Sequence, residues 1–334
     1  MTANRIAIVR RAGGPERVEV IDAATPVPRA GDVLIAVEAT GVAFADVVMR
    51  KGVYPGVGFP FTPGYEVVGR VVSGDGIAPG TRVAALTVTG GAARLAVVPA
   101  ADCVAVPDAV PSVQAAALVL NGLTAWQMLT RCVAQPSVET MLVWGAAGGV
   151  GSVLLALGRH FGIRTFGVAS GSRQDFVRQR GATPIDRAGD VAAQVRAASD
   201  GGVDAAFDGV GGPNVRISEA ALRPGGCLVM FGFQGALGGE RLNPLKAAAA
   251  VLRSPRRSAQ AQFLAGTGRR GYLIGQWKDA HPAFYRDDLA AILALAAEGR
   301  LVADIAAELP LDRIADAHRM MAAGTQPGKI VIRP

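Results

Sequence analysis

The sequence contains few of the residues that build disulfide frameworks. Its three cysteines, Cys103, Cys132 and Cys227, lie far apart and form no C-x-x-C pair. This spacing excludes a disulfide framework and a cysteine-rich zinc lobe, and it suits a reducing compartment.

Long apolar runs and an obvious leader are also missing. No apolar stretch approaches the roughly 18 residues that a membrane-spanning helix requires. The first expected strand, residues 5–10, begins too near the N-terminus to leave room for a signal peptide. We therefore expect a cytoplasmic protein.

Charged residues are sparse. They make up 18% of the 334 residues, and half of the residues are apolar, which favours a globular chain of two domains. The net charge of +7 would suit an anionic ligand, but the basic residues are dispersed and no aromatic residues interleave with them. We therefore expect no nucleic-acid partner.

The first hundred residues have the pattern of short strands separated by glycine and proline. The expected strands are residues 5–10, 18–21, 33–39, 67–72, 82–86 and 93–98. Between them, residues 50–63 form an irregular loop rich in glycine and proline, and long loops of this kind are usually functional or disordered. The pattern predicts a compact β-barrel-type domain.

The second half is organised around a glycine-rich turn, residues 145–151, with the sequence GAAGGVG. An apolar strand leads into the turn and an apolar-periodic helix leads out of it. Glycines there let the backbone approach a pyrophosphate, and the first N–H groups of the helix face its charge. The spacing departs from G-x-G-x-x-G, so the turn alone is weak evidence.

Strands and helices alternate around this turn, and such alternation forces parallel pairing. The expected strands are 141–144, 165–169, 204–208 and 227–231, and the expected helices are 113–120, 123–133, 153–161, 173–180, 191–198, 214–222 and 242–252. This is the pattern of an α/β Rossmann domain with a doubly wound parallel sheet.

The C-terminal tail is too short and too poor in strands to fold alone. It offers a possible strand at 272–276, helices at 284–297 and 311–322, and a final strand at 329–333. We expect it to complete the first domain. The expected organisation is therefore a catalytic domain at 1–122, a nucleotide-binding domain at 123–263, and the completion of the catalytic domain at 264–334.

The strand after the glycine turn indicates which dinucleotide is bound. NAD-binding domains usually carry an acidic residue about 20 residues beyond the turn, which binds the ribose 2′-hydroxyl. Here no carboxylate occurs before Asp175. Ser170 and Arg173 would instead receive the 2′-phosphate of NADPH, with Arg187 as a second cation. The alternative is that Ser172 caps the following helix and Arg173 is solvated.

Several motifs run along nearly the whole chain: ATGVAFAD at 39–46, GVYP at 52–55, PGYE at 63–66, GLTA at 122–125, AAGGVG at 146–151 and GK at 328–329. Their order resembles that of the medium-chain dehydrogenase/reductase superfamily, and more narrowly its zinc-free quinone oxidoreductase branch of zeta-crystallin and VAT-1-like proteins. The resemblance implies a GroES-like catalytic domain beside the Rossmann domain. It also implies a homodimer formed through the nucleotide-binding sheet, which the apolar strand 227–231 would permit.

The resemblance also bears on metal binding. Zinc-dependent members have cysteine, histidine and cysteine where this chain has Ala43, Tyr65 and a residue near Leu120, and these residues are poor zinc ligands. The histidines of the chain lie elsewhere, at His160, His281 and His318. We therefore expect no catalytic zinc.

Without a Lewis acid, oxidation of a simple alcohol lacks a means of stabilising the alkoxide. Reduction of a quinone or an α,β-unsaturated carbonyl is easier because conjugation disperses the incoming charge. In the related family the loop at 50–63 lines the active site, which makes Tyr54 the first candidate for a hydrogen-bond or proton donor and Tyr65 the second. The alternative for each is a packing tyrosine. Asp46 is expected to hold the loop.

The resemblance implies a set of residues along the dinucleotide. Ala43 would lie beside the nicotinamide, where the branch typically has asparagine, so a polar anchor is absent. Arg187 stands where relatives often carry an aromatic residue against adenine, and it could stack there or bind phosphate. The other implied residues are Thr124, Ala147, Gly148, Gly149, Val150, Val210, Phe231, Gly232, Phe233 and Lys329.

The leading hypothesis is an NADPH-dependent reductase of small-molecule quinones or enones. One alternative is an enoyl-thioester reductase of a biosynthetic pathway. Another is a weakly catalytic NADPH-binding sensor or membrane-surface protein that would use Arg253, Arg256, Arg257, Arg269 and Arg270. Charge runs of this kind are usually solvated faces, so a membrane surface is the less favoured partner.

Overall fold

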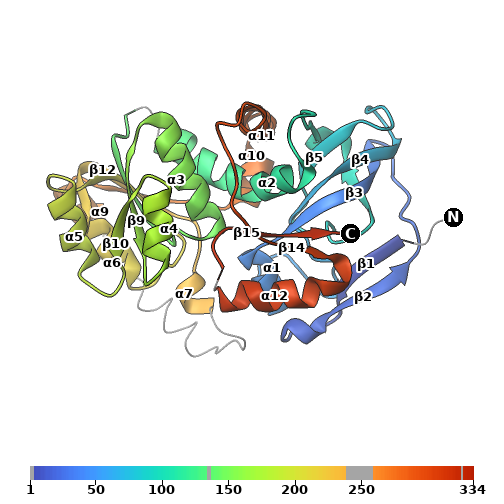
Figure 1. Ribbon diagram of the computed structural model, residues 1–334, viewed down its shortest axis with the longest axis horizontal. Coiled ribbons are helices and arrows are strands. Elements are labelled where there is room, and N and C mark those ends of the chain that lie inside the picture. The colour runs from blue at the N-terminus through green and yellow to red at the C-terminus, as the bar shows by residue number, and fades with distance from the viewer. Residues whose placement is uncertain (1–3, 134–136, 238–258, 325) are drawn as a thin grey trace. The chain divides into compact units, whose positions relative to one another are not determined.

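The computed structural model describes residues 4–133, 137–237, 259–324 and 326–334. Contacts within the chain divide these residues into two compact units (Figure 1). Unit 1 contains residues 4–123 and 278–334, and unit 2 contains the described residues of 124–277.

Unit 1 is built on a largely antiparallel sheet with the strand order β14-β15-β3-β4-β5-β7, and β6 pairs with β3. Its strands are β3 (Asp32–Val42), β4 (Glu66–Gly74), β5 (Arg82–Leu86), β6 (Leu95–Pro99), β7 (Val104–Ala105), β14 (Ile305–Pro310) and β15 (Lys329–Arg333). A separate antiparallel pair consists of β1 (Asn4–Val9) and β2 (Val18–Ala23).

The core of this sheet follows the two-residue period of its strands. Side chains that alternate along β3 and β4 point to one face, where Val33, Ile35, Val37, Val67 and Val71 form a buried cluster. The six strands expected in the first hundred residues are all present. The strand β14 was not predicted from the sequence, because the alanine-rich segment IAAELP that forms it shows no apolar alternation.

The helices associated with unit 1 are α1 (Phe44–Arg50), α11 (Pro282–Ala297) and α12 (Ile314–Ala323). Two further helices, α2 (Ser112–Gln127) and α10 (Ile274–Ala280), extend across the division between the units, and α2 continues into a π-helical turn at Met128–Cys132. The sequence did not predict α1, which is only 7 residues long and shows no helical period.

Unit 2 contains a six-stranded sheet with the order β10-β9-β8-β11-β12-β13, in which every neighbouring pair is parallel. The strands are β8 (Thr140–Trp144), β9 (Arg164–Ala169), β10 (Thr183–Asp186), β11 (Val203–Asp208), β12 (Leu222–Met230) and β13 (Gly268–Gly271). The helices are α3 (Gly149–Phe161), α4 (Arg173–Gln179), α5 (Val191–Ala198), α6 (Asn214–Ala220), α7 (Gln234–Leu237) and α9 (Ala259–Ala265). The predicted doubly wound Rossmann sheet is confirmed.

The C-terminal part of unit 2 differs from the sequence prediction. The strand expected at 272–276 is wrong, because α10 begins at Ile274 and the strand lies earlier, at β13. Since β13 pairs with β12, the chain returns to unit 1 at Lys278, whereas the sequence placed this return at residue 264. The segment GRRG of β13 has no apolar pattern that would reveal a strand. The helix expected at 242–252 lies outside the described residues.

The strand proposed for dimerisation needs a related correction. Residues 227–231 fall largely in β12, which is hydrogen-bonded to β11 on one side and β13 on the other. Its backbone edges are therefore already paired, and the edge of the sheet on this side is β13.

Candidate functional site

The glycine turn joins β8 to α3 and requires glycine for steric reasons. Gly145 adopts a positive φ of 64°, and its carbonyl accepts the N–H of Gly148 at 2.8 Å. A Cβ on Gly151 would lie 2.2 Å from the carbonyl oxygen of Gly145. The strand and the helix can therefore pack this closely only if residue 151 lacks a side chain.

This turn leaves the start of a helix open to a ligand. Gly148 is the exposed N-cap of the 13-residue α3, while Gly149 and Val150 are half-buried and Ala147 is buried. The first N–H groups of a helix have no partner within it, and they carry the positive end of the helix dipole. Unit 2 thus offers a candidate anion-binding cradle at the carboxyl end of β8. The arrangement fits a dinucleotide pyrophosphate.

A buried carboxylate organises the adjacent strand end. Asp208, the last residue of β11, is fully buried and accepts the N–H groups of Val210 at 2.7 Å and Gly211 at 3.0 Å. Its other oxygen lies 3.5 Å from the Ser218 hydroxyl, which accepts the indole N–H of Trp144 at 2.8 Å. Burial raises the pKa of Asp208. The network joins the ends of β8 and β11, and no local sequence pattern predicts it.

The four residues expected to continue the dinucleotide path lie at the ends of neighbouring strands. The Phe231 N–H donates to the carbonyl of Asp208 at 3.0 Å, and the Gly235 N–H donates to the carbonyl of Val210 at 2.9 Å. A Cβ on Gly232 would lie 2.7 Å from the carbonyl oxygen of Gly209. Val210, Phe231 and Gly232 are half-buried and Phe233 is 49% exposed. The structure brings the four together beside the loop that Asp208 holds.

The residues expected to receive a 2′-phosphate surround the end of β9. Ser170 is exposed in the turn that leads into α4, and Arg173 is the exposed first residue of that helix. The Arg187 N–H donates to the carbonyl of Ala169 at 3.1 Å, which places exposed Arg187 next to this turn. The Ser172 side chain makes no capping hydrogen bond to α4. Ser172 therefore occupies the N-cap position without a side-chain cap, and both alternatives for Arg173 stay predictions.

In unit 1, the two candidate tyrosines contact one another. Their hydroxyl oxygens lie 2.6 Å apart, and the rings pack edge to face with centroids 6.3 Å apart. Tyr65 is 1% exposed, whereas Tyr54 is half-buried. Burial raises the pKa of both phenols. Both are therefore neutral at physiological pH, and one of them donates its proton to the other.

Asp46 fixes the backbone around these tyrosines. Its carboxylate is 1% exposed and accepts the N–H of Ala43 at 2.8 Å and the N–H of Gly64 at 2.9 Å. Burial raises the pKa of Asp46, although both N–H groups act in the opposite direction. Asp46 therefore ties the start of α1 to the residue before Tyr65.

On the other side of Tyr65, Glu66 and Lys329 form a buried ion pair. The carboxylate Oε1 and the ammonium Nζ lie 2.7 Å apart, and the side chains are 0% and 2% exposed. Burial raises the pKa of Glu66, while the attraction of Lys329 and the backbone N–H of Gly41 act in the opposite direction. A Cβ on Gly41 would lie 1.9 Å from Oε1 and 2.0 Å from Cε of Lys329, so this glycine makes room for the pair.

The remaining predicted residues are buried. Ala43 is 7% exposed in unit 1, and Thr124 is 6% exposed in unit 2. Of the predicted residues, unit 1 also contains Tyr54, Tyr65 and Lys329, and unit 2 contains all the others. Sequence reasoning missed the role of Glu66 as the partner of Lys329, although Glu66 belongs to the quoted PGYE segment.

The described residues contain no group of three or more His, Cys, Asp or Glu side chains arranged to hold a metal ion. His318 is fully buried in α12, where burial and the nearby Arg50 lower its pKa to about 3. It is therefore a neutral core residue at physiological pH. In the same described part of the chain, no helix is both long enough and apolar enough to cross a membrane.

Two family models match the chain. Residues 29–108 match the alcohol dehydrogenase GroES-like domain, and residues 181–332 match the zinc-binding dehydrogenase family. The first match lies within unit 1, and the second covers the later part of unit 2 together with the C-terminal part of unit 1.

Individual proteins are similar over most of the chain. The rat synaptic vesicle membrane protein VAT-1 homolog is 31% identical over 96% of this chain and 82% of its own length. A probable quinone oxidoreductase of Schizosaccharomyces pombe is 30% identical over 83% of this chain and 86% of its own length. The pikromycin polyketide synthase component PikAII of Streptomyces venezuelae is 30% identical over 90% of this chain, which corresponds to 8% of that protein.

A solved structure extends the likeness to three dimensions. A mycobacterial protein complexed with NADPH has a TM-score of 0.85 and 29% identity, and the match covers 99% of this chain and 100% of that one.

Proposed function

Since the chain belongs to the medium-chain dehydrogenase/reductase superfamily, we propose that this oxidoreductase transfers hydride from NADPH to a quinone or an α,β-unsaturated carbonyl without zinc. The observation that carries the proposal is the hydroxyl pair of Tyr54 and Tyr65, which supplies neutral proton donors in the unit where zinc-dependent relatives hold their metal.

The cofactor would be held mainly by unit 2. We propose that the pyrophosphate binds the backbone of Ala147, Gly148, Gly149 and Val150 at the start of α3. The 2′-phosphate would be bound by the Ser170 hydroxyl and the Arg173 guanidinium, with Arg187 as the second cation. The NADPH held by the mycobacterial relative supports this choice of cofactor.

The other residues that the family resemblance implies have these proposed roles. Val210, Phe231, Gly232 and Phe233 would contact the dinucleotide through backbone and shape, and Thr124 through its hydroxyl. Ala43 would pack against the nicotinamide without a polar contact. Lys329 would act mainly by neutralising Glu66, since its ammonium is buried against that carboxylate.

NADPH, when bound, supplies the hydride. Hydride addition to a conjugated carbonyl places negative charge on the carbonyl oxygen, which a neutral phenol can stabilise by donating a hydrogen bond or a proton. The half-buried Tyr54 is the better donor to substrate, because Tyr65 is almost wholly buried. If Tyr65 donates to the Tyr54 oxygen, the Tyr54 proton is polarised for donation.

A substrate screen tests the proposal. NADPH oxidation would be followed at fixed enzyme concentration with quinones, enones and enoyl thioesters, each with NADH as the matched cofactor control. Turnover with a quinone or an enone, at a kcat/KM higher with NADPH than with NADH, is expected. Failure of every acceptor, with NADPH binding intact, would refute the reductase.

A second candidate is reduction of enoyl thioesters in a biosynthetic pathway. The match to PikAII, a polyketide synthase component, favours it, and the same tyrosines would serve it. In the same screen, turnover confined to enoyl thioesters would replace the leading proposal with this one.

The non-catalytic alternative, an NADPH-binding sensor at a membrane surface, has support only from the name of the VAT-1 relatives. Of the arginines it would use, Arg253, Arg256 and Arg257 lie outside the described residues, and Arg269 is paired with Glu219. We retain a cytoplasmic homodimer as the proposed state. Sedimentation equilibrium, and co-sedimentation with anionic vesicles, test the dimer and the membrane surface.

A further inference from the structure

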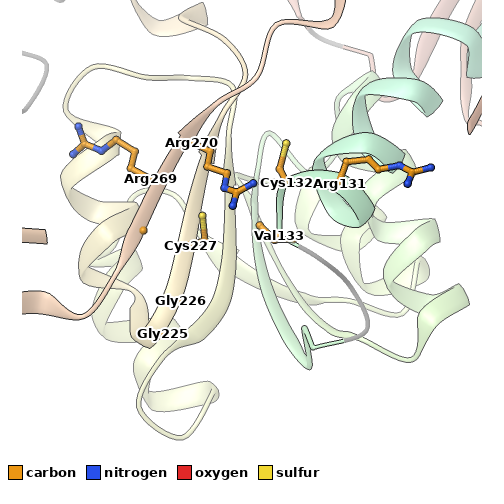
Figure 2. A pocket seen from close by; sticks show the side chains of 9 residues that line it. Arg131, Cys132, Val133, Gly225, Gly226, Cys227, Arg269 and Arg270 are labelled. Atoms are coloured by element: carbon orange, nitrogen blue, oxygen red, sulfur yellow. The ribbon is translucent and has the colours of Figure 1, made fainter. Parts of the chain in front are cut away.

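Unit 2 contains a pocket that the proposed reaction does not use. Its volume is about 350 Å³, and it lies among the π-helical turn that follows α2, the middle of β12, and β13 (Figure 2). Its lining residues are Arg131, Cys132, Val133, Gly225, Gly226, Cys227, Gly268, Arg269 and Arg270. Three of these are cations, and none is a carboxylate.

The three arginines differ in how their charge is balanced. The Arg269 guanidinium is bound by the buried carboxylate of Glu219 through its Nε at 3.0 Å and through a second nitrogen. In Figure 2 the Arg269 and Arg131 side chains extend away from the centre, whereas Arg270 points between Cys227 and Cys132. Among the residues that the structure describes, Arg270 forms no ion pair. The central cation of the pocket is therefore not neutralised by a described carboxylate.

The two cysteines of the pocket are protonated thiols rather than reactive anions. Burial raises the pKa of Cys132 to about 11 and also raises the pKa of Cys227, while Arg270 acts in the opposite direction on both. The two uncharged thiols line the pocket on either side of the Arg270 guanidinium.

The pocket is separate from the dinucleotide cradle. Cys227 lies three residues before Met230, the last residue of β12, which corresponds to roughly 10 Å of strand. Cys227 lies level with Ala205 of β11 and Met141 of β8, in the amino-terminal half of those two strands, whereas the glycine turn follows the carboxyl end of β8.

We propose that this pocket binds a small oxyanion, the phosphate or carboxylate group of a metabolite, with Arg270 as its principal ligand. A guanidinium presents parallel N–H groups that match both kinds of oxyanion. Arg131 adds positive charge at the rim.

Alkylation of the cysteines tests the charge of the pocket directly. The full-length protein would be treated with iodoacetate, an anion, or iodoacetamide, its neutral analogue, and the modified residues identified by mass spectrometry. The ratio of the two rates at one thiol cancels the fraction of thiolate. Cys103 is an internal control, because it is also half-buried and its pKa is raised to about 12, but its charged neighbours include Asp102.

We expect the ratio of the iodoacetate rate to the iodoacetamide rate to be about tenfold higher at Cys227 than at Cys103. This is the effect expected of one positive charge a few ångströms away in a partly screened site. Arg270→Gln should lower the ratio to that of Cys103. Arg216→Gln, an exposed arginine of α6 in the same unit, should leave it unchanged. Equal ratios at the two cysteines of the wild-type protein, or a Cys227 that neither reagent modifies, would overturn the proposal whatever the variants do.

Ligand protection identifies the oxyanion. Inorganic phosphate and acetate would be compared with chloride at equal ionic strength for protection of Cys227 against iodoacetamide. Protection by phosphate alone indicates that the pocket binds a phosphate group, and protection by acetate indicates that it binds a carboxylate. Either kind of protection should require Arg270. Protection equal to that of chloride would refute a built site, and loss of protection in saturating NADPH would refute its separation from the cofactor.

Discussion

Replacing Lys329 with methionine should destabilise unit 1 far more than an ordinary surface substitution would. The methionine approximates the length of the lysine stem but removes its charge, so Glu66 remains in the core without its cation. Glu66 is 0% exposed and its partner lies 2.7 Å away. Breaking such a buried pair from one side costs about 3–5 kcal/mol of unfolding free energy.

A matched control lies on the same strand. Arg333, also in β15, pairs with Glu308 in a contact whose side chains are 58% and 42% exposed. Exposed pairs of this kind contribute about 0–1 kcal/mol, so Arg333→Met should have a small effect. The double variant Glu66→Leu/Lys329→Met should recover most of the lost stability, because it removes both buried charges.

The loss should also depend on pH. Burial raises the pKa of Glu66 from its ordinary value of 4.5, and Lys329 opposes that rise. Without Lys329 the folded-state pKa rises further, so the cost of the buried charge is present at neutral pH and is relieved as the pH falls toward 4.5. The difference between wild type and Lys329→Met should therefore shrink as the pH falls from 8 to 5.

Urea denaturation monitored by circular dichroism, which reports on both units, measures these differences. Trp126, Trp144 and Trp277 all lie in unit 2, so agreement of tryptophan fluorescence with circular dichroism would justify a two-state treatment of the whole chain. The reasoning would be refuted if Lys329→Met lost no more stability than Arg333→Met. The same variants decide how Lys329 affects the cofactor. If the double variant binds NADPH as well as the wild type does, Lys329 acts through Glu66 and not through direct contact.

The other predictions concern the cofactor and the chemistry. Arg173→Ala should weaken NADPH binding about ten- to a hundredfold in a fluorescence titration, the loss of one charge-assisted contact of about 1.5–3 kcal/mol, with little effect on NADH; equal losses would reject the 2′-phosphate site. Tyr54→Phe should lower kcat about tenfold or more, as loss of a general acid does, and adding Tyr65→Phe should cost little more; a fully additive double variant would show that the hydroxyls act separately. Gly151→Ala should abolish NADPH binding or soluble expression, since its Cβ would lie 2.2 Å from a carbonyl oxygen, and a normally active variant would contradict the turn geometry. Metal analysis should find no stoichiometric zinc, and loss of activity on dialysis against a chelator would refute zinc independence.

The sequence predicted elements well where local pattern and tertiary role agree. Residues 82–86, 191–198 and 329–333 carry their own apolar period, and the structure contains an element with those same bounds at each place. The local sequence pattern did not predict elements that form only because they pair with a neighbouring strand. The segment GRRG forms β13 because it pairs with the hydrogen-bonding edge of β12. No property of those four residues alone predicts a strand.

For the candidate sites too, the sequence predicts features with a local cause and does not predict those that depend on strand pairing. The glycine turn is visible in sequence, because its steric demand is local: Gly151 must clear the carbonyl of a residue close to it in the chain. The ion pair of Glu66 with Lys329 cannot be predicted from the local sequence, because the two residues lie far apart in the chain. Only the pairing of β15 with β3 and of β3 with β4 brings them together. Likewise, the contact of the two tyrosine hydroxyls depends on the path of an irregular loop.

Buried groups anchor the backbone on both sides of Tyr65, whereas Tyr54 lies in an irregular loop. The residue before Tyr65 donates its N–H to Asp46, and the residue after it carries the carboxylate paired with Lys329. Tyr65 is thus fixed between two buried ionic groups, and its position costs little further entropy when a substrate binds. Tyr54 lies in the loop rich in glycine and proline, outside any helix or strand, and its hydroxyl contacts that of Tyr65. The rigid phenol therefore orients the more accessible one, which is the arrangement expected if Tyr54 meets the substrate and Tyr65 acts through it.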